Sequence, residues 1–203
     1  MALVVDRANV EPGGKVRLAV ILDHEPYWHT YAYGSAAAVE QGLITVEVSA
    51  TPDASQLTVH NDKIGWPAAE KMEVSYGGPP ATLDVYEGRA IVYVPITVEM
   101  AAAKGPVHIP VSARVQACDD KSCLAPTDLT QTITINVVSL AQAQTTSDYP
   151  EIFADFPEAV WASLSTPGRA EHPHEDDPTP IIVLVAVGIT IIVVAYIWMK
   201  YAR

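Results

Sequence analysis

The chain has 203 residues, of which 49% are hydrophobic and 18% charged, so it is neither disordered nor of low complexity. Acidic residues outnumber basic ones by 24 to 12, which gives a formal net charge of −12 and argues against a nucleic-acid partner, because such a partner requires a basic surface. The two cysteines are too few for a disulfide-rich scaffold or a four-cysteine zinc site.

The first 140 residues carry the pattern of short β-strands. Apolar residues alternate with other residues in the runs 16–22, 44–48, 90–98, 111–117 and 133–137. Turn signals such as Pro12-Gly13-Gly14 separate these runs, and no long helical pattern interrupts them. We therefore predict that residues 1–140 form a mostly β domain, an antiparallel β-sandwich of the immunoglobulin type. Pro95 and Pro110 lie inside such runs, so we expect edge positions or bulges there.

The two cysteines, Cys118 and Cys123, enclose a short loop of residues 119–122. If the flanking segments pair antiparallel, the two sulfurs come within reach of one another, and an oxidising compartment would favour a disulfide. A disulfide that closes a small exposed loop is a candidate for exchange chemistry, and a structural staple is the alternative. Asp119 and Asp120 should raise the pKa of a neighbouring thiol, whereas Lys121 should lower it.

Four short motifs follow one another between residues 10 and 138. They are Trp28-His29-Thr30-Tyr31 followed by Gly34, then Gly65-Trp66-Pro67, then Tyr86-Glu87-Gly88, and finally Gln116-Ala117-Cys118 through Cys123-Leu124-Ala125-Pro126. As an ordered set, they resemble the N-terminal periplasmic domain of the thiol:disulfide interchange protein DsbD and its relatives. The resemblance covers about two-thirds of the chain.

This resemblance implies an immunoglobulin-like sandwich that exposes a redox pair, Cys118 and Cys123, on a hairpin. In the family, this domain receives electrons from a membrane partner and passes them to periplasmic proteins that isomerise disulfides or mature cytochromes c. The family shields its disulfide with an aromatic cap loop; here Ser75 stands where the aromatic residue is expected, and Tyr76 is adjacent. The loop between the cysteines is one residue shorter than in the best-known member.

The segment 141–165 combines a polar linker, residues 141–147, with a short amphipathic pattern. Apolar residues recur there at steps of three and four, which predicts one apolar helical face that includes Tyr149, Phe153, Phe156 and Trp161. Two interpretations remain open at this point. The face packs back onto the sandwich, or it docks another protein.

The C-terminal residues predict a membrane anchor. Residues 166–180 are rich in proline and acidic side chains and form an expected tether, in which His172 and His174 belong to a solvated segment rather than to a metal site. Residues 181–199 carry no charge and, as a helix, would extend about 28 Å, close to the thickness of a bilayer core. Lys200 and Arg203 place the tail, residues 200–203, in the cytoplasm.

This topology predicts a single-pass protein of the bacterial inner membrane with its sandwich in the periplasm. Residues 1–10 lack the charged-then-apolar pattern of a signal peptide, which leaves the start of translation open. The family's multi-helix membrane domain and thioredoxin-like domain do not follow in this sequence. We therefore expect a separate electron donor, either a membrane protein or a thioredoxin-like protein.

Two functions follow from this reading of the sequence. The first is thiol–disulfide exchange at Cys118 and Cys123, without a metal or other cofactor. The second is a non-catalytic accessory subunit of a larger membrane complex, photosynthetic or respiratory, in which the same sandwich keeps a structural disulfide. The expected partners are the lipid bilayer together with either an electron donor or the other subunits of such a complex.

Overall fold

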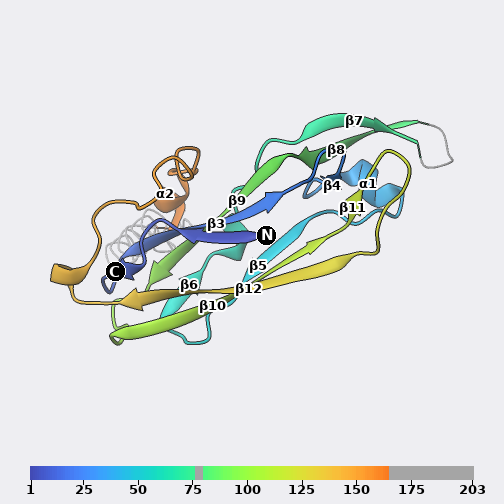
Figure 1. The fold of residues 1–203 in the computed structure, drawn as a ribbon. Coiled ribbons are helices and arrows are strands. Elements are labelled where there is room, and N and C mark those ends of the chain that lie inside the picture. The colour runs from blue at the N-terminus through green and yellow to red at the C-terminus, as the bar shows by residue number, and fades with distance from the viewer. Residues whose placement is uncertain (76–79, 165–203) are drawn as a thin grey trace, which may run out of the picture. The chain divides into compact units, whose positions relative to one another are not determined.

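A computed structural model describes residues 1–75 and 80–164 of the chain (Figure 1). Two compact units are distinguished, Met1–Val160 and Trp161–Arg203, and all described strands belong to the first. The elements, in chain order, are β1 (Ala2–Val5), β2 (Asn9–Val10), β3 (Lys15–Asp23), β4 (His29–Tyr31), α1 (Ala36–Glu40), β5 (Glu47–Ala50), β6 (Leu57–Val59), the 3-10 turn η1 (Asn61–Lys63), β7 (Glu70–Val74), β8 (Ala81–Glu87), β9 (Arg89–Val98), β10 (Gly105–Val115), β11 (Ala117–Cys118), β12 (Thr127–Val137), the 3-10 turn η2 (Leu140–Gln142) and α2 (Val160–Leu164).

The described strands form three four-stranded sheets. Sheet A has the order β1-β3-β9-β6, sheet B the order β2-β12-β10-β5, and sheet C the order β11-β4-β8-β7. All pairings are antiparallel except that of β2 with β12. Sheets A and B contribute the residues of one continuous apolar core, and Figure 1 shows the strands β7 and β8 of sheet C at one end of the unit. The predicted mostly β sandwich is thereby confirmed.

The alternation seen in the sequence builds the core between sheets A and B. Val16, Leu18 and Val20 on β3 and Val92 and Val94 on β9 are fully buried in it. Along β3 and β9, nine residue pairs are in register, from Lys15 opposite Thr97 to Asp23 opposite Arg89. One face of each strand is therefore apolar because it faces the other sheet, as period-two patterning requires.

The outer face of β9 is also covered, by the segment that follows the last strand. Tyr93 is 7% exposed because the rings of Phe153 and Phe156 lie 6.2 and 5.6 Å from its own, and its hydroxyl donates a 2.6 Å hydrogen bond to the Ile152 carbonyl. Both phenylalanines are buried. The sequence left open whether these residues pack on the sandwich or dock another protein. In the structure, the rings of Phe153 and Phe156 pack on the sandwich.

The segment 148–158 has no helical hydrogen-bonding pattern, although the spacing of its apolar residues predicts one. Turns occupy residues 150–155, and the short helix α2 begins only at Val160. Pro150 and Pro157 explain the difference, because each lacks a backbone N–H and disfavours a helical conformation in the preceding residue. The predicted helical face is therefore not formed over residues 150–155, whereas a short helix does follow Pro157. The apolar residues are brought onto β9 by turns instead.

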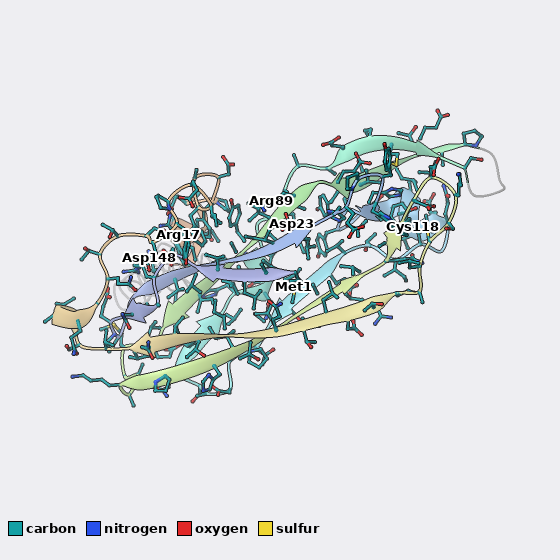
Figure 2. All side chains as sticks on the ribbon, viewed as in Figure 1. Met1, Arg17, Asp23, Arg89, Cys118 and Asp148 are labelled. Atoms are coloured by element: carbon teal, nitrogen blue, oxygen red, sulfur yellow. A yellow bond between two sulfur atoms is a disulfide. The ribbon has the colours of Figure 1, made fainter. Side chains whose placement is uncertain are left out.

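Polar contacts fasten this segment to the start of the chain. The backbone N–H of Asp148 donates to the Asp6 carbonyl at 3.0 Å, and the Gln144 side-chain carbonyl accepts from the N–H groups of Ala8 and Asn9. Arg17 bonds the carboxylates of Asp6 at 2.9 Å and Glu158 at 2.7 Å, and its guanidinium lies over both phenylalanine rings. Figure 2 shows Arg17 and Asp148 together, far from Cys118.

Pro95 and Pro110, for which edge positions or bulges are expected, stand in strands that have neighbours on both sides. Each nevertheless lies just past the end of its shorter neighbour. β6 ends at Val59, and the next residue, His60, donates its N–H to the Pro95 carbonyl; β5 ends at Ala50, and Thr51 donates to the Pro110 carbonyl. The missing N–H of each proline therefore faces a position where no ladder bond is needed.

Within residues 1–75 and 80–164, no helix is both long and apolar enough to cross a membrane. The predicted tether, span and tail, residues 166–203, lie outside the described residues, as does Tyr76 of the predicted cap loop. The assignment of a membrane span to residues 181–199 therefore stays a prediction.

Candidate redox site at the Cys118–Cys123 hairpin

The chain changes sheets immediately before the first cysteine. The sequence predicts one strand over 111–117, but β10 ends at Val115 in sheet B and β11 begins at Ala117 in sheet C. Gln116 makes this crossing, and its side-chain amide holds both sides of it. The carbonyl oxygen accepts from the Ile44 N–H at 2.9 Å, and the amide nitrogen donates to the Leu124 carbonyl at 3.2 Å.

Cys118 and Cys123 are joined by a disulfide, as the sequence predicts. They occupy opposite positions in an antiparallel bridge, with their Cα atoms 4.0 Å apart. Inside the loop, the N–H of Asp119 donates to the Ser122 carbonyl at 2.9 Å; outside it, the N–H of Leu124 donates to the Ala117 carbonyl at 2.8 Å. The disulfide thus closes a four-residue hairpin whose backbone is hydrogen-bonded on both sides of the cysteines.

Asp119 organises the tip of this hairpin. One of its carboxylate oxygens accepts hydrogen bonds from the N–H groups of Lys121 at 2.8 Å and Ser122 at 2.6 Å. These bonds to the ionised form hold the pKa of Asp119 below its usual range, so the group stays negative near the sulfurs. An aspartate that begins a tight turn is a known sequence signal. The charge of Asp119 was predicted to act on the thiols, but this hydrogen-bonding role was not predicted.

The two sulfurs differ in exposure. Cys118 is completely buried in a small apolar cluster that includes Leu83 and Val85 of β8, whereas Cys123 is only partly buried at the rim of that cluster. The hydroxyl of Tyr31, a fully buried residue of β4, lies 3.8 Å from the Cys123 sulfur. A reagent from solvent can therefore reach the sulfur of Cys123 more readily than that of Cys118.

The motif residues of β4 pair with the hairpin and pack against it. Cys118 pairs with His29 across β11 and β4, and the His29 ring meets that of Tyr31 edge-on at 5.5 Å. His29 is 1% exposed, and this burial lowers the pKa of its imidazole, which favours the neutral form. His29 is thus a packing residue of the site rather than a solvent-accessible base.

A groove of about 380 Å³ lies beside the hairpin. Its wall is mostly apolar and includes Trp28, Ala117 and Leu124, the last being 55% exposed. The structure therefore places Trp28 of the motif next to the chain segments that carry both cysteines. This groove was not predicted from the sequence, because residues from all three sheets line it.

Of the remaining predicted site residues, Ser75 directly follows Val74 of the apolar cluster around Cys118, whereas Trp66, Tyr149 and Trp161 lie outside that cluster. Trp66 stacks on Tyr33 with ring centres 4.2 Å apart, and it packs against the main core rather than on the disulfide. Ser75 directly follows β7. Tyr149 is 45% exposed on the segment that follows β12, and Trp161 lies in α2 at the start of the second unit. Among the described residues, no group of histidine, cysteine and acidic side chains is arranged to hold a metal.

No family model and no curated protein matches this chain. Among solved structures it is similar to the N-terminal periplasmic domain of ScsB from Proteus mirabilis, with 14% identity, a TM-score of 0.44 and coverage of 75% of this chain and 52% of that one. It is also similar to the DsbD N-terminal domain of Neisseria meningitidis in the reduced form, with 20% identity, a TM-score of 0.34 and coverage of 68% and 91%. The chain thus spans about half the length of the ScsB domain chain.

Proposed function

We propose that this chain is a thiol–disulfide exchange domain whose redox pair is Cys118 and Cys123. The observation that carries the proposal is the asymmetry of the disulfide: one sulfur is buried and the other is reachable, on a short hairpin beside an open apolar groove. A staple needs no such asymmetry, whereas exchange requires that one sulfur be open to attack. The motif resemblance to the DsbD family adds support from the sequence.

The exchange step follows from this geometry. A thiolate of a reduced partner attacks the sulfur of Cys123, the bond between the two cysteines breaks, and the sulfur of Cys118 leaves as a thiolate that takes up a proton. The partner's second thiol then attacks the sulfur of the partner's first cysteine in the mixed disulfide, and Cys123 is released as a thiol. The net result is one oxidised partner and one reduced hairpin, with two electrons transferred. Cys123 can then attack the disulfide of a downstream protein by the reverse sequence.

The surroundings of Cys123 set its reactivity in the reduced state. The Tyr31 hydroxyl is positioned to donate to a thiolate at Cys123, which favours the ionised form. The carboxylate of Asp119, one residue after Cys118, opposes a second negative charge nearby. We propose that the groove lined by Trp28 and Leu124 receives apolar surface of the partner around its attacking cysteine.

The reduction potential of the pair tests this function. Thiol trapping across a glutathione or dithiothreitol series is expected to give about −180 to −270 mV, the range of exchange proteins. A value below roughly −300 mV would mark a structural staple and overturn the proposal. That result would instead favour the accessory-subunit function, in which the sandwich serves only as a scaffold.

We also propose that residues 181–199 anchor the chain in the inner membrane, with the sandwich on the periplasmic side. The support is the uncharged apolar run followed by Lys200 and Arg203. After alkaline carbonate extraction, the full chain should stay with the membrane pellet. The double variant Val187→Arg and Ile191→Arg should move to the supernatant, because charges at the centre of a span are costly. Extraction of the unaltered chain would contradict the anchor.

A further inference from the structure

A second cavity, of about 590 Å³, lies on the outer face of sheet B and shares no residue with the cysteine hairpin or its groove. Its floor is formed by β5 and β10, whose exposed residues Glu47 and Ser49 face Arg114 and Ser112 across the strand pair. The volume falls within the roughly 300–1,000 Å³ of typical small-molecule sites.

Two stacked aromatic rings form one wall of this cavity. Tyr33 and Trp66 are parallel within 3°, with centroids 4.2 Å apart. Trp66 is partly buried against the core, so it supports Tyr33, which remains 54% exposed. An exposed ring held by a buried one is a rigid flat platform, because the lower ring restricts the rotation of the upper one.

The rest of the lining contains both a guanidinium, that of Arg114, and carboxylates, such as those of Glu47 and Asp128. Arg114 pairs with Asp128 at 3.1 Å, and Glu47 stands opposite Arg114 in the strand register. Within residues 1–75 and 80–164, the Tyr33 hydroxyl, the Trp66 indole N–H and the Glu47 carboxylate are used in no hydrogen bond with the protein. The cavity therefore offers two donors and an acceptor around a flat apolar platform.

We infer that this cavity binds a neutral saccharide of hexose rings. A sugar ring has an apolar face of C–H groups that packs on an aromatic plane, and hydroxyls at its rim that both donate and accept. An anionic ligand would meet the carboxylates of Glu47, Asp62 and Asp128, which line the cavity. Arg114 on the cavity floor is already paired with Asp128, and the groups left without a protein partner include two uncharged donors, the Tyr33 hydroxyl and the Trp66 indole N–H, which match the hydroxyls of a neutral sugar.

The test uses the full chain in a detergent without a sugar headgroup. Cellotriose, chitotriose and maltotriose serve as probes, with binding followed by calorimetry and by saturation-transfer NMR. At least one trisaccharide is expected to bind with a Kd in the millimolar range or below. Tyr33→Ala should weaken that binding about tenfold or more, whereas Tyr33→Phe keeps the platform and should stay within about twofold.

Two further variants separate the site from a general loss of structure. Glu47→Ala changes an exposed acceptor and should weaken binding several-fold, whereas Tyr149→Ala removes a similarly exposed tyrosine outside the cavity and should change nothing. If no probe binds up to about 10 mM, or if Tyr33→Ala binds as the wild type does, the inference is overturned. Binding of tetramethylammonium or phosphate at this site in place of the sugars would overturn the assigned chemistry. None of these outcomes depends on the redox state of Cys118 and Cys123.

Discussion

The hydroxyl of Tyr31 lies 3.8 Å from the sulfur of Cys123, which is the less buried of the two sulfurs. In the reduced protein, this hydroxyl is placed to donate to the thiolate that performs the exchange. Because the tyrosine is fully buried, its orientation is fixed by packing rather than by solvent.

Replacing this hydroxyl should slow the redox chemistry more than it affects folding. Tyr31→Phe keeps the ring and removes the donor, so the thiolate fraction of Cys123 should fall. We expect iodoacetamide to alkylate the reduced variant about two- to tenfold more slowly at pH 7. The free energy of unfolding should change by only about 1 kcal/mol, the usual net value of one hydrogen bond. An unchanged alkylation rate would show that the hydroxyl has no part in activating Cys123.

The two cysteines should respond differently to substitution by serine. Cys118→Ser leaves the reachable sulfur, which should attack glutathione disulfide, release one glutathione and keep the other in a mixed disulfide that the hairpin has no second thiol to resolve. Cys123→Ser leaves the buried sulfur, which should react with a thiol reagent at least about tenfold more slowly in the native state. Mass spectrometry of the adducts and stopped-flow titration measure both. Equal rates for the two variants would contradict the assignment of Cys123 as the attacked sulfur.

The charge of Asp119 can be separated from its bonding role. Asp119→Asn keeps an oxygen acceptor for the turn but removes the negative charge, so thiolate formation nearby should become easier and alkylation of the reduced hairpin about two- to fivefold faster at pH 7. Asp119→Ala also removes the bonds from Lys121 and Ser122. It should therefore loosen the hairpin, which backbone amide exchange of these two residues would detect as faster exchange.

Arg17 should contribute far more to the free energy of unfolding than Arg89, although both form ion pairs. Arg17 bonds Asp6, which is 3% exposed. In Arg17→Ala this buried carboxylate keeps only the backbone N–H of residue 17 at 2.9 Å and the Arg7 guanidinium at 3.9 Å, so the free energy of unfolding should fall by about 2 kcal/mol. Arg89 bonds Asp23 at 2.7 Å, but both side chains are more than half exposed. Arg89→Ala should lower the free energy of unfolding far less than Arg17→Ala, because water screens an exposed ion pair. Urea unfolding of both variants measures the difference, and equal losses would contradict this reading of Asp6.

Buried His29 predicts a pH dependence of stability. Its pKa is lowered by burial, so the unfolded chain binds a proton more readily than the folded one. The contribution of His29 is complete above its unfolded pKa of about 6.5 and is lost as pH falls below that value, with a slope of at most about 1.4 kcal/mol per pH unit. His60, whose pKa is also lowered by burial, acts in the same direction.

The variant His29→Gln isolates this contribution. Unfolding free energies measured between pH 7.5 and 5 should fall less steeply for the variant than for the wild type, because one group that gains a proton on unfolding has been removed. The lowered pKa of Asp119 acts in a separate window, since its contribution is lost only below about pH 4. Identical slopes for wild type and variant would show that His29 does not titrate on unfolding.

Sequence patterning predicts the core strands because period-two alternation directly reports which face is buried. The residues of β3 and β9 that face the other sheet follow that pattern, and the disulfide follows from the spacing of two cysteines. Tyr93 breaks it, because its burial depends on Phe153 and Phe156, which lie about 60 residues further along the chain. Local alternation carries no information about such a distant cover.

The parts of the candidate site that escape prediction are those made by separate segments. The asymmetry of the two sulfurs depends on how Cys118 of β11 packs against β8, and the groove depends on how residues of all three sheets come together. The positions of Pro95 and Pro110 also depend on a separate segment, the neighbouring strand. A proline in a strand predicts a missing ladder bond, but only the length of the neighbouring strand shows that the bond is not required.

The fastening of residues 144–158 to the beginning of the chain also determines how the domain carries load. A pull applied beyond residue 158 is borne first by the ion pairs of Arg17, by the Tyr93 hydroxyl and by the bond between Asp148 and Asp6. These contacts lie far from Cys118, at the other end of the unit (Figure 2). A force applied where the chain leaves the sandwich would therefore act first on these contacts and not directly on the Cys118–Cys123 hairpin.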